Sequence, residues 1–84
     1  MVTTTFNKFV SAQGRADMVM ENHGWDLVKL TDVYGDVHTC YIRSTSMTPD
    51  DEPLVVIEPK PATKDGLGYM FASDIVQVET IEEG

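Results

Sequence analysis

The short turns between the β-rich segments that follow Gly24 constrain this chain more than any other feature. Five segments dominated by β-branched, aromatic and other apolar residues follow that glycine, and Gly, Pro, Asp or Ser punctuate the stretches between them. These stretches are too short for the crossover helix that joins parallel strands, so the strands must pair antiparallel. The sequence therefore predicts a mainly β fold with a five-stranded, strongly bent antiparallel sheet that forms a small open barrel.

The predicted strands differ in how clearly the sequence marks them. Residues 37–44 give the clearest signal, because β-formers dominate and neither Gly nor Pro interrupts them. Residues 54–57 form a continuous apolar run, which is typical of a strand buried on both faces. The remaining predicted elements are strands at 25–31, 69–72 and 75–80, a surface loop at 59–68 and a solvated tail at 81–84.

One α-helix is predicted before the barrel, from about residue 5 to residue 20. The threonine hydroxyls at 3–5 offer N-caps, and apolar residues then recur at steps of three and four. The predicted apolar stripe consists of Phe6, Phe9, Val10, Ala16 and Met20. Trp25 follows the helix and is interpreted as the residue that docks it onto the barrel. Alternatively, Trp25 forms a stacking platform with Tyr34 and Tyr41.

The charge balance bears on partners rather than on the fold. The 84 residues, expected to form a single domain over 1–84, include 14 Asp and Glu but only 6 Lys and Arg, a formal net charge of -8. Such acidity repels polyanions and lowers the expectation of strong sequence-independent nucleic-acid binding. The start of the chain lacks the pattern of a secretory signal, and no apolar stretch is long enough to span a bilayer. We therefore expect a cytoplasmic protein without a membrane partner.

Residues with catalytic or metal-binding chemistry form no recognisable motif. Cys40 has no second cysteine to pair with and is interpreted as a small core residue. His23 and His38 lack a metal-binding spacing, and the acids at 50–52 lack the alternating ligands of a calcium loop. A Gly-rich phosphate loop, a Ser-His-Asp set and a carboxylate pair are also missing. We therefore expect no enzymatic activity, no cofactor and no metal.

The segment from Tyr69 to Val78 combines a short strand, an almost immediate turn at residues 73–74 and a strand rich in Val and Ile. It resembles the second signature of the Sm/LSm-like small β-barrels, which include the bacterial Sm-like RNA chaperones. Tyr69 and Ala72 match the Tyr and Ala of the bacterial branch. Gly35 and Met47 fit the turn glycine and the methionine of the first signature. The resemblance covers about residues 25–80.

The resemblance implies a ring-forming protein that binds RNA or single-stranded nucleic acid and acts in RNA or DNA processing. Strand 69–72 of one copy would pair with strand 75–80 of the next, so that no edge stays open. The nucleic-acid site implied in the pore comprises Arg43, Ser44, Met47, Thr48, Met70 and Phe71. The implied oligomer interface comprises Tyr69, Phe71, Val76 and Val78.

Departures from the family favour a second hypothesis, an acidic protein-interaction module or inhibitor that binds a basic protein surface. Ser44 and Thr48 replace the Asp and Asn of the first signature, and Met70 and Phe71 replace the basic and His residues of the second. Arg43 is the best-placed cation for a phosphate or a base.

Overall fold

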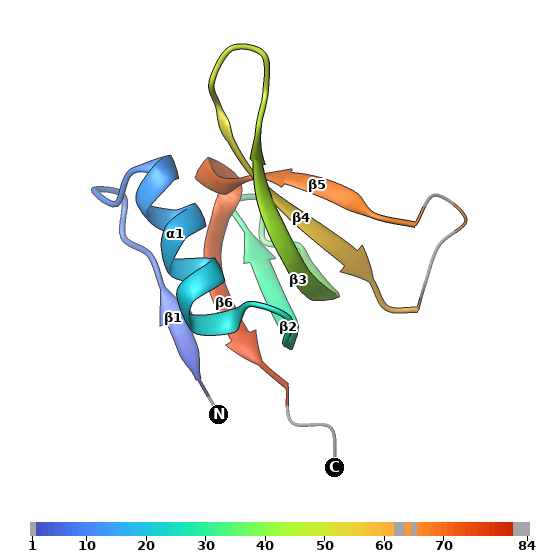
Figure 1. Ribbon diagram of the computed structural model, residues 1–84. Helices are drawn as coiled ribbons and strands as arrows, with labels where there is room; N and C mark the ends of the chain where they lie inside the picture. Colours follow the sequence, from blue (N-terminus) through green and yellow to red (C-terminus); the bar gives the residue numbers. More distant parts are fainter. Residues whose placement is uncertain (1, 62–63, 65, 82–84) are drawn as a thin grey trace.

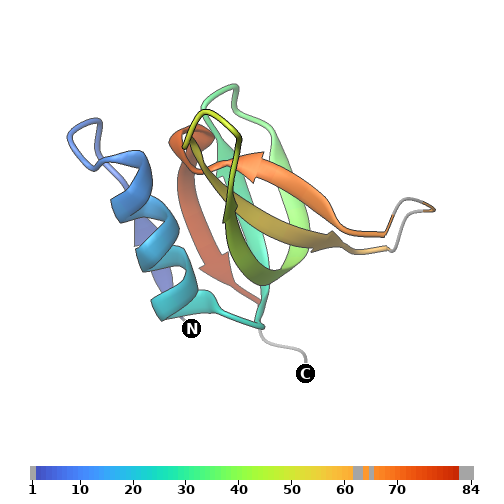
Figure 2. The same ribbon diagram turned by 45° about the horizontal axis from the view of Figure 1, so that its top comes forward.

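One helix packs against a strongly bent antiparallel sheet in the described part of the chain (Figures 1 and 2). The structure, a computed structural model, describes residues 2–61, 64 and 66–81. In chain order its elements are β1 (Thr3–Thr5), α1 (Ala12–His23), β2 (Leu27–Asp32), β3 (Val37–Met47), β4 (Pro53–Pro59), β5 (Gly68–Phe71), a 3₁₀ turn (Ala72–Asp74) and β6 (Ile75–Thr80). The described strands form a 6-stranded sheet in the order β1-β6-β2-β3-β4-β5. The prediction of a mainly β fold with an N-terminal helix is confirmed, and the prediction of five strands is wrong.

The additional strand, β1, is the threonine run that the sequence predicts as helix N-caps. Thr4 faces Val78 in register, and the Phe6 N–H donates to the Val76 carbonyl oxygen at 2.8 Å. β-branched side chains favour this extended backbone over a helical one. The helix begins only after Ser11, whose Oγ accepts a hydrogen bond from the Gly14 N–H at 3.0 Å.

The later start of α1 changes which residues the helix buries. Its buried residues are Arg15, Ala16, Val19 and His23. Phe9 precedes the helix and is 84% exposed, so its prediction as part of the apolar stripe is wrong. Phe6 does reach the core, but from the segment that follows β1.

The core lies between α1 and the inner face of the sheet (Figure 2). Ala16 and Val19 contribute from the helix. The strands contribute Val28, Leu30, Cys40, Ile42, Val55, Ile57, Ile75 and Val78. The prediction that Cys40 is a core residue is confirmed, and burial raises its pKa to about 11.

The predicted bend between the last two strands is also confirmed. Only the 3₁₀ turn separates β5 from β6, and the two do not pair with each other: β5 pairs with β4, and β6 pairs with β1 and β2. β3 and β4 run beyond the predicted 37–44 and 54–57 because they form one long hairpin (Figure 1). Residues 62, 63 and 65 of the predicted loop and 82–84 of the predicted tail lie outside the described residues.

Candidate ligand-binding face

Three strands present a set of side chains on the side of the sheet that faces away from the core. Residues directly opposite each other in antiparallel strands point to the same side. The register forms three rows there: Tyr41 with Glu58, Ser44 with Val56 and Tyr69, and Ser46 with Leu54 and Phe71. We call these residues, together with Arg43, the outer face.

Arg43 lies between two aromatic rings on this face. It occupies the bulge of β3, where the register with β4 shifts between Ile42 and Ser44. The Arg43 Cζ atom is 4.9 Å from the centroid of the Tyr41 ring and 5.5 Å from that of the Trp25 ring, within the range of cation–π interactions. The Lys60 Nζ atom lies 5.9 Å from the Tyr41 centroid. We call Trp25, Tyr41, Arg43 and Lys60 the arginine–aromatic cluster.

Trp25 faces solvent, with 68% of its surface exposed. Its φ of 70° lies in the left-handed region, which costs a non-glycine residue about 1–2 kcal/mol. The Trp25 N–H donates to the Ile42 carbonyl oxygen at 2.7 Å and so holds this backbone in place. The interpretation of Trp25 as a helix-docking residue is therefore wrong. The alternative platform forms in part, because Tyr41 shares Arg43 with Trp25, whereas Tyr34 lies in the turn between β2 and β3.

Glu58 neutralises Arg43 across the hairpin. The Arg43 Nη2 and Glu58 Oε2 atoms are 2.7 Å apart, and the two side chains are 29% and 38% exposed. Solvent screens a pair of this exposure, so its contribution to stability is about 0–1 kcal/mol. A phosphate that approached the guanidinium would compete with this carboxylate.

The residues implied for nucleic-acid binding lie in three places. Arg43, Ser44 and Phe71 belong to the outer face. Met47 and Thr48 lie near the tip of the β3–β4 hairpin, where the Thr48 Oγ1 accepts a hydrogen bond from the Glu52 N–H at 3.0 Å. Met70 packs against the core instead. Within one copy, Met47, Thr48 and Met70 therefore lie apart from the outer face.

The residues implied for the oligomer interface differ in accessibility. Tyr69 and Phe71 on β5 are 66% and 43% exposed. Val76 is half-buried, and Val78 is fully buried in the core. β6 has β1 on one side and β2 on the other, so the expectation of an open β6 edge is wrong for this conformation. The reason is that the threonine run pairs with that edge instead of starting the helix.

A buried histidine at the end of α1 connects the helix to β1 and β6 by hydrogen bonds. The His23 Nε2 lies 2.8 Å from the Thr4 Oγ1, and its Nδ1 lies 2.9 Å from the Thr80 Oγ1. Burial lowers the pKa of His23, and the nearby Asp26 carboxylate opposes that shift. Sequence reasoning misses this cluster because the partners of His23 are 19 and 57 residues away. The available signal is position, since His23 lies one helical turn after the buried Val19.

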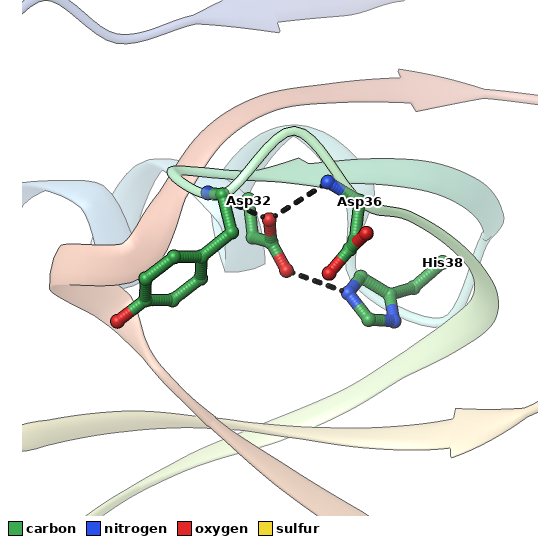
Figure 3. Close-up of polar contacts among 4 residues, drawn as sticks. Asp32, Asp36 and His38 are labelled. Atoms are coloured by element: carbon green, nitrogen blue, oxygen red, sulfur yellow. Dashed lines mark hydrogen bonds and ion pairs between the residues drawn. The ribbon is translucent and has the colours of Figure 1, made fainter.

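Asp32 organises the turn between β2 and β3 (Figure 3). Its Oδ1 accepts hydrogen bonds from the N–H groups of Tyr34 at 2.9 Å and Asp36 at 3.0 Å. Its Oδ2 lies 2.9 Å from the His38 Nε2, and this hydrogen bond is the main reason why the pKa of Asp32 is lowered. These contacts stay within one hairpin, so we assign them to the geometry of the turn.

The described residues form neither a pocket nor a metal-binding cluster. Residues 2–61, 64 and 66–81 enclose no pocket and hold no group of three His, Cys, Asp or Glu residues that could bind a metal ion. Over the same residues, no helix has the length and apolar character needed to cross a membrane. Comparisons of the chain with models of protein families, with curated proteins and with solved structures give no match. The candidate site therefore rests on the geometry of the outer face.

Proposed function

We propose that the protein binds single-stranded nucleic acid, RNA in the first instance, on the arginine–aromatic cluster and the adjoining outer face. The observation that carries the proposal is Trp25, which has a left-handed backbone, is 68% exposed and lies beside Arg43. Residues in such strained conformations persist only where the surrounding structure holds them, and they gather at functional sites.

Exposed aromatic rings next to cations are the chemistry that binds unpaired bases. A base that stacks on an aromatic side chain contributes about 1–3 kcal/mol, with little dependence on sequence. Trp25 offers an open ring, while Arg43 and Lys60 offer positive charge for phosphates. Ser44 and Ser46 add exposed hydroxyls in the neighbouring rows. Because stacking needs little net positive charge, this mode suits a chain with a net charge of -8.

An Sm-like small barrel is the fold that we propose for this function. In support, β5, the 3₁₀ turn and β6 follow each other as in the second Sm signature. Ring assembly through pairing of β5 with β6 of the next copy requires β1 to leave β6, because β1 occupies that edge. We therefore propose the ring only for a state in which β1 is displaced.

A second candidate function is an acidic module that binds a basic protein surface. The Arg43–Glu58 ion pair favours it, because this pair already satisfies the cation that a phosphate would need. Trp, Tyr and Arg are also the residues most enriched among those that dominate the energetics of protein interfaces. The net charge of -8 attracts a basic partner at long range.

Trp25→Gly tests the first proposal because it removes the ring and suits the backbone. Glycine adopts positive φ freely, and this gain offsets the entropy it adds to the unfolded chain, so the free energy of unfolding should change by less than about 1 kcal/mol. The affinity for labelled oligo-U, oligo-A or single-stranded DNA should fall about 5- to 100-fold. The control is Tyr34→Ala, which removes a ring that is 77% exposed in the β2–β3 turn and should leave the affinity unchanged.

Glu58→Gln distinguishes the two candidate functions. The change releases Arg43 and removes a negative charge, so oligonucleotide affinity should rise about 2- to 5-fold at low salt. Affinity for a peptide rich in Lys and Arg should fall instead, because the peptide loses a carboxylate partner. Fluorescence titrations at low and moderate salt measure both. Saturable binding of the basic peptide, together with no binding of any oligonucleotide, rejects the nucleic-acid proposal.

A further inference from the structure

β5 ends the sheet on the side away from α1, and none of the described residues forms a strand beside its outer edge (Figure 1). Its sequence, Gly-Tyr-Met-Phe, contains neither a charge nor a proline. Natural proteins usually protect an edge strand with lysines, prolines, bulges or extreme shortness, because an open edge is a template for another strand. β5 is short, with 4 residues, but it has no lysine or proline to protect its edge.

The opposite end of the sheet differs from β5. β1 has 3 residues, and its central side chain, Thr4, is buried and bonded to His23. On β5, Tyr69 and Phe71 are 66% and 43% exposed, and both belong to the outer face. Large apolar side chains grouped on a surface mark an interaction site more often than isolated ones do. The unpaired edge and the exposed rings coincide on β5.

The charges near β5 indicate which kind of partner it binds. Phe71, at the end of β5, pairs with Leu54, and the β3–β4 hairpin continues beyond this pair to the exposed acids at 50–52 (Figure 1). These acids and the net charge of -8 disfavour nucleic acid at this edge, and a second copy whose β1 stays on β6 has no free β6 edge to offer β5. A basic protein segment is attracted instead.

We propose that β5 docks an extended segment of a partner protein, which adds as an antiparallel strand and carries basic residues at its amino-terminal end. All pairs in the sheet are antiparallel, and such pairing is slightly more stable per residue than parallel pairing. This direction places the start of the segment beside Phe71, where the hairpin acids meet its basic residues. Alternate side chains of the segment then lie on the outer face next to Tyr69 and Phe71. This site is distinct from the arginine–aromatic cluster and does not depend on nucleic-acid binding.

Peptide probes test the docking edge on the unaltered protein. The first probe is a labelled peptide of alternating valine and threonine preceded by two lysines. The second carries the lysines at its carboxyl end, and the third is the first with alternate backbone nitrogens methylated so that they cannot pair. Fluorescence anisotropy should show the first binding at least about tenfold more tightly than the methylated probe and about 2- to 30-fold more tightly than the probe with lysines at its carboxyl end. Amide hydrogen exchange should slow within β5 when the first probe binds.

Charge variants give an independent test. Asp50→Asn combined with Asp51→Asn should weaken binding of the first probe about 2- to 30-fold, because it removes two exposed ion pairs with the lysines of the probe. Asn also suits the positive φ of 63° at Asp51. The matched control, Glu21→Gln with Asp36→Asn, removes the same charge elsewhere and should leave binding unchanged.

Several results would overturn the proposal. Equal binding of the methylated probe excludes strand addition, and equal binding of the two lysine arrangements excludes the antiparallel direction. Equal effects of the two double variants would show that the net charge, and not the acids at 50–52, attracts the peptide. Trp25→Gly should not alter peptide binding, so a failure of the nucleic-acid proposal and a failure of the docking edge can be told apart.

Discussion

Arg15 is a cation that backbone carbonyl groups hold inside the fold. Its guanidinium donates to the carbonyl oxygens of Asn7, Val10, Ser73 and Ile75 at 2.9–3.1 Å. It also lies over the Phe6 ring, with 5.8 Å between Cζ and the ring centroid. These bonds join the segment before α1, the helix itself and the 3₁₀ turn that separates β5 from β6. The sharp bend on which the Sm-like proposal depends is therefore supported from the helix.

Arg15→Met should lower the free energy of unfolding by about 3 kcal/mol, because it leaves buried carbonyl groups without donors. Arg15→Lys should recover little of this loss, since an ammonium group cannot reproduce the planar set of donors. Urea unfolding measures both changes. Lys29→Met, at an exposed position of β2, is the control and should change stability by less than about 0.5 kcal/mol. Similar losses for Arg15→Met and Lys29→Met would contradict the structural role of Arg15.

His23 should make the protein less stable in mild acid. Burial is the main cause that lowers the pKa of His23 below its usual value of 6.5, so the folded state favours the neutral ring. The unfolded chain therefore takes up a proton that the folded chain resists. The stability from this group is complete above about pH 6.5 and is lost as the pH falls from there toward the folded pKa.

Urea midpoints measured between about pH 7.5 and pH 5 should therefore fall in the wild-type chain. His23→Gln removes the titrating ring, so its midpoint should depend less on pH in this range, even if the variant is less stable overall. His38→Gln is the matched control, because it removes the other histidine, which lies in β3 and bonds to Asp32. An unchanged pH dependence in His23→Gln would show that another group is responsible.

At the residue scale, the sequence predicts apolar core positions better than buried polar ones. Cys40 could be placed in the core because it lies in a strand of β-forming residues. Arg15 could not, because its partner Ser73 is 58 residues away and compensates the cost of burial only in the folded chain. The exposure of Trp25 could not be predicted either, because it follows from a positive φ that no local sequence pattern indicates.

At the scale of elements, Gly24 fixes the end of α1. Its N–H donates to the Met20 carbonyl oxygen at 3.1 Å, and a Cβ added at Gly24 would lie only 2.7 Å from the same oxygen. The helix end would have to shift to relieve this contact, so Gly24→Ala should lower the free energy of unfolding by about 1–3 kcal/mol. Thermal or urea unfolding measures the loss.

Gly68→Ala is the matched control for the helix end. A Cβ at Gly68 would meet the Ile57 side chain at 3.6 Å, which is an ordinary van der Waals contact. Stability should therefore change by less than about 0.5 kcal/mol. A loss as large as that of Gly24→Ala would mean that the close contact at the helix end is not the cause.

The strands could be predicted where their own pattern is strong. The predicted strand 75–80 coincides with β6 (Ile75–Thr80), because apolar and polar residues alternate in its sequence, although the residues that it buries are Ile75 and Val78, three positions apart. β1 could not be predicted in this way, since three threonines carry no alternation and become a strand only against β6. The contact between Thr5 and Gln77 spans 72 residues, which no local window detects. Because the sequence does not indicate β1, it also predicts a helix that starts earlier than α1 does.

At the scale of the whole molecule, β1 decides which edges of the sheet are available for assembly. With β1 on β6, the sheet ends in β1 and β5. A ring built from β5–β6 contacts cannot form in this state, because each β6 edge is already occupied. Arg43, the best-placed cation of the predicted site, still reaches the outer face in a single copy. The proposed nucleic-acid binding therefore does not require the proposed ring.

Deletion of residues 1–5 should give a discrete oligomer, which the full-length chain does not form through β5–β6 contacts while β1 is paired with β6. The deletion removes β1 and the Thr4 contact to His23, so β6 gains a free edge that β5 of another copy can pair with. Native mass spectrometry and light scattering at micromolar concentration measure the change, with Thr3→Ala as a control that keeps the strand. Val76→Lys or Phe71→Asp in the shortened chain should disperse the oligomer, because each places a charge at the β5–β6 contact. A shortened chain that stays folded and monomeric would reject the ring, and a full-length ring with β1 still paired would place its interface elsewhere.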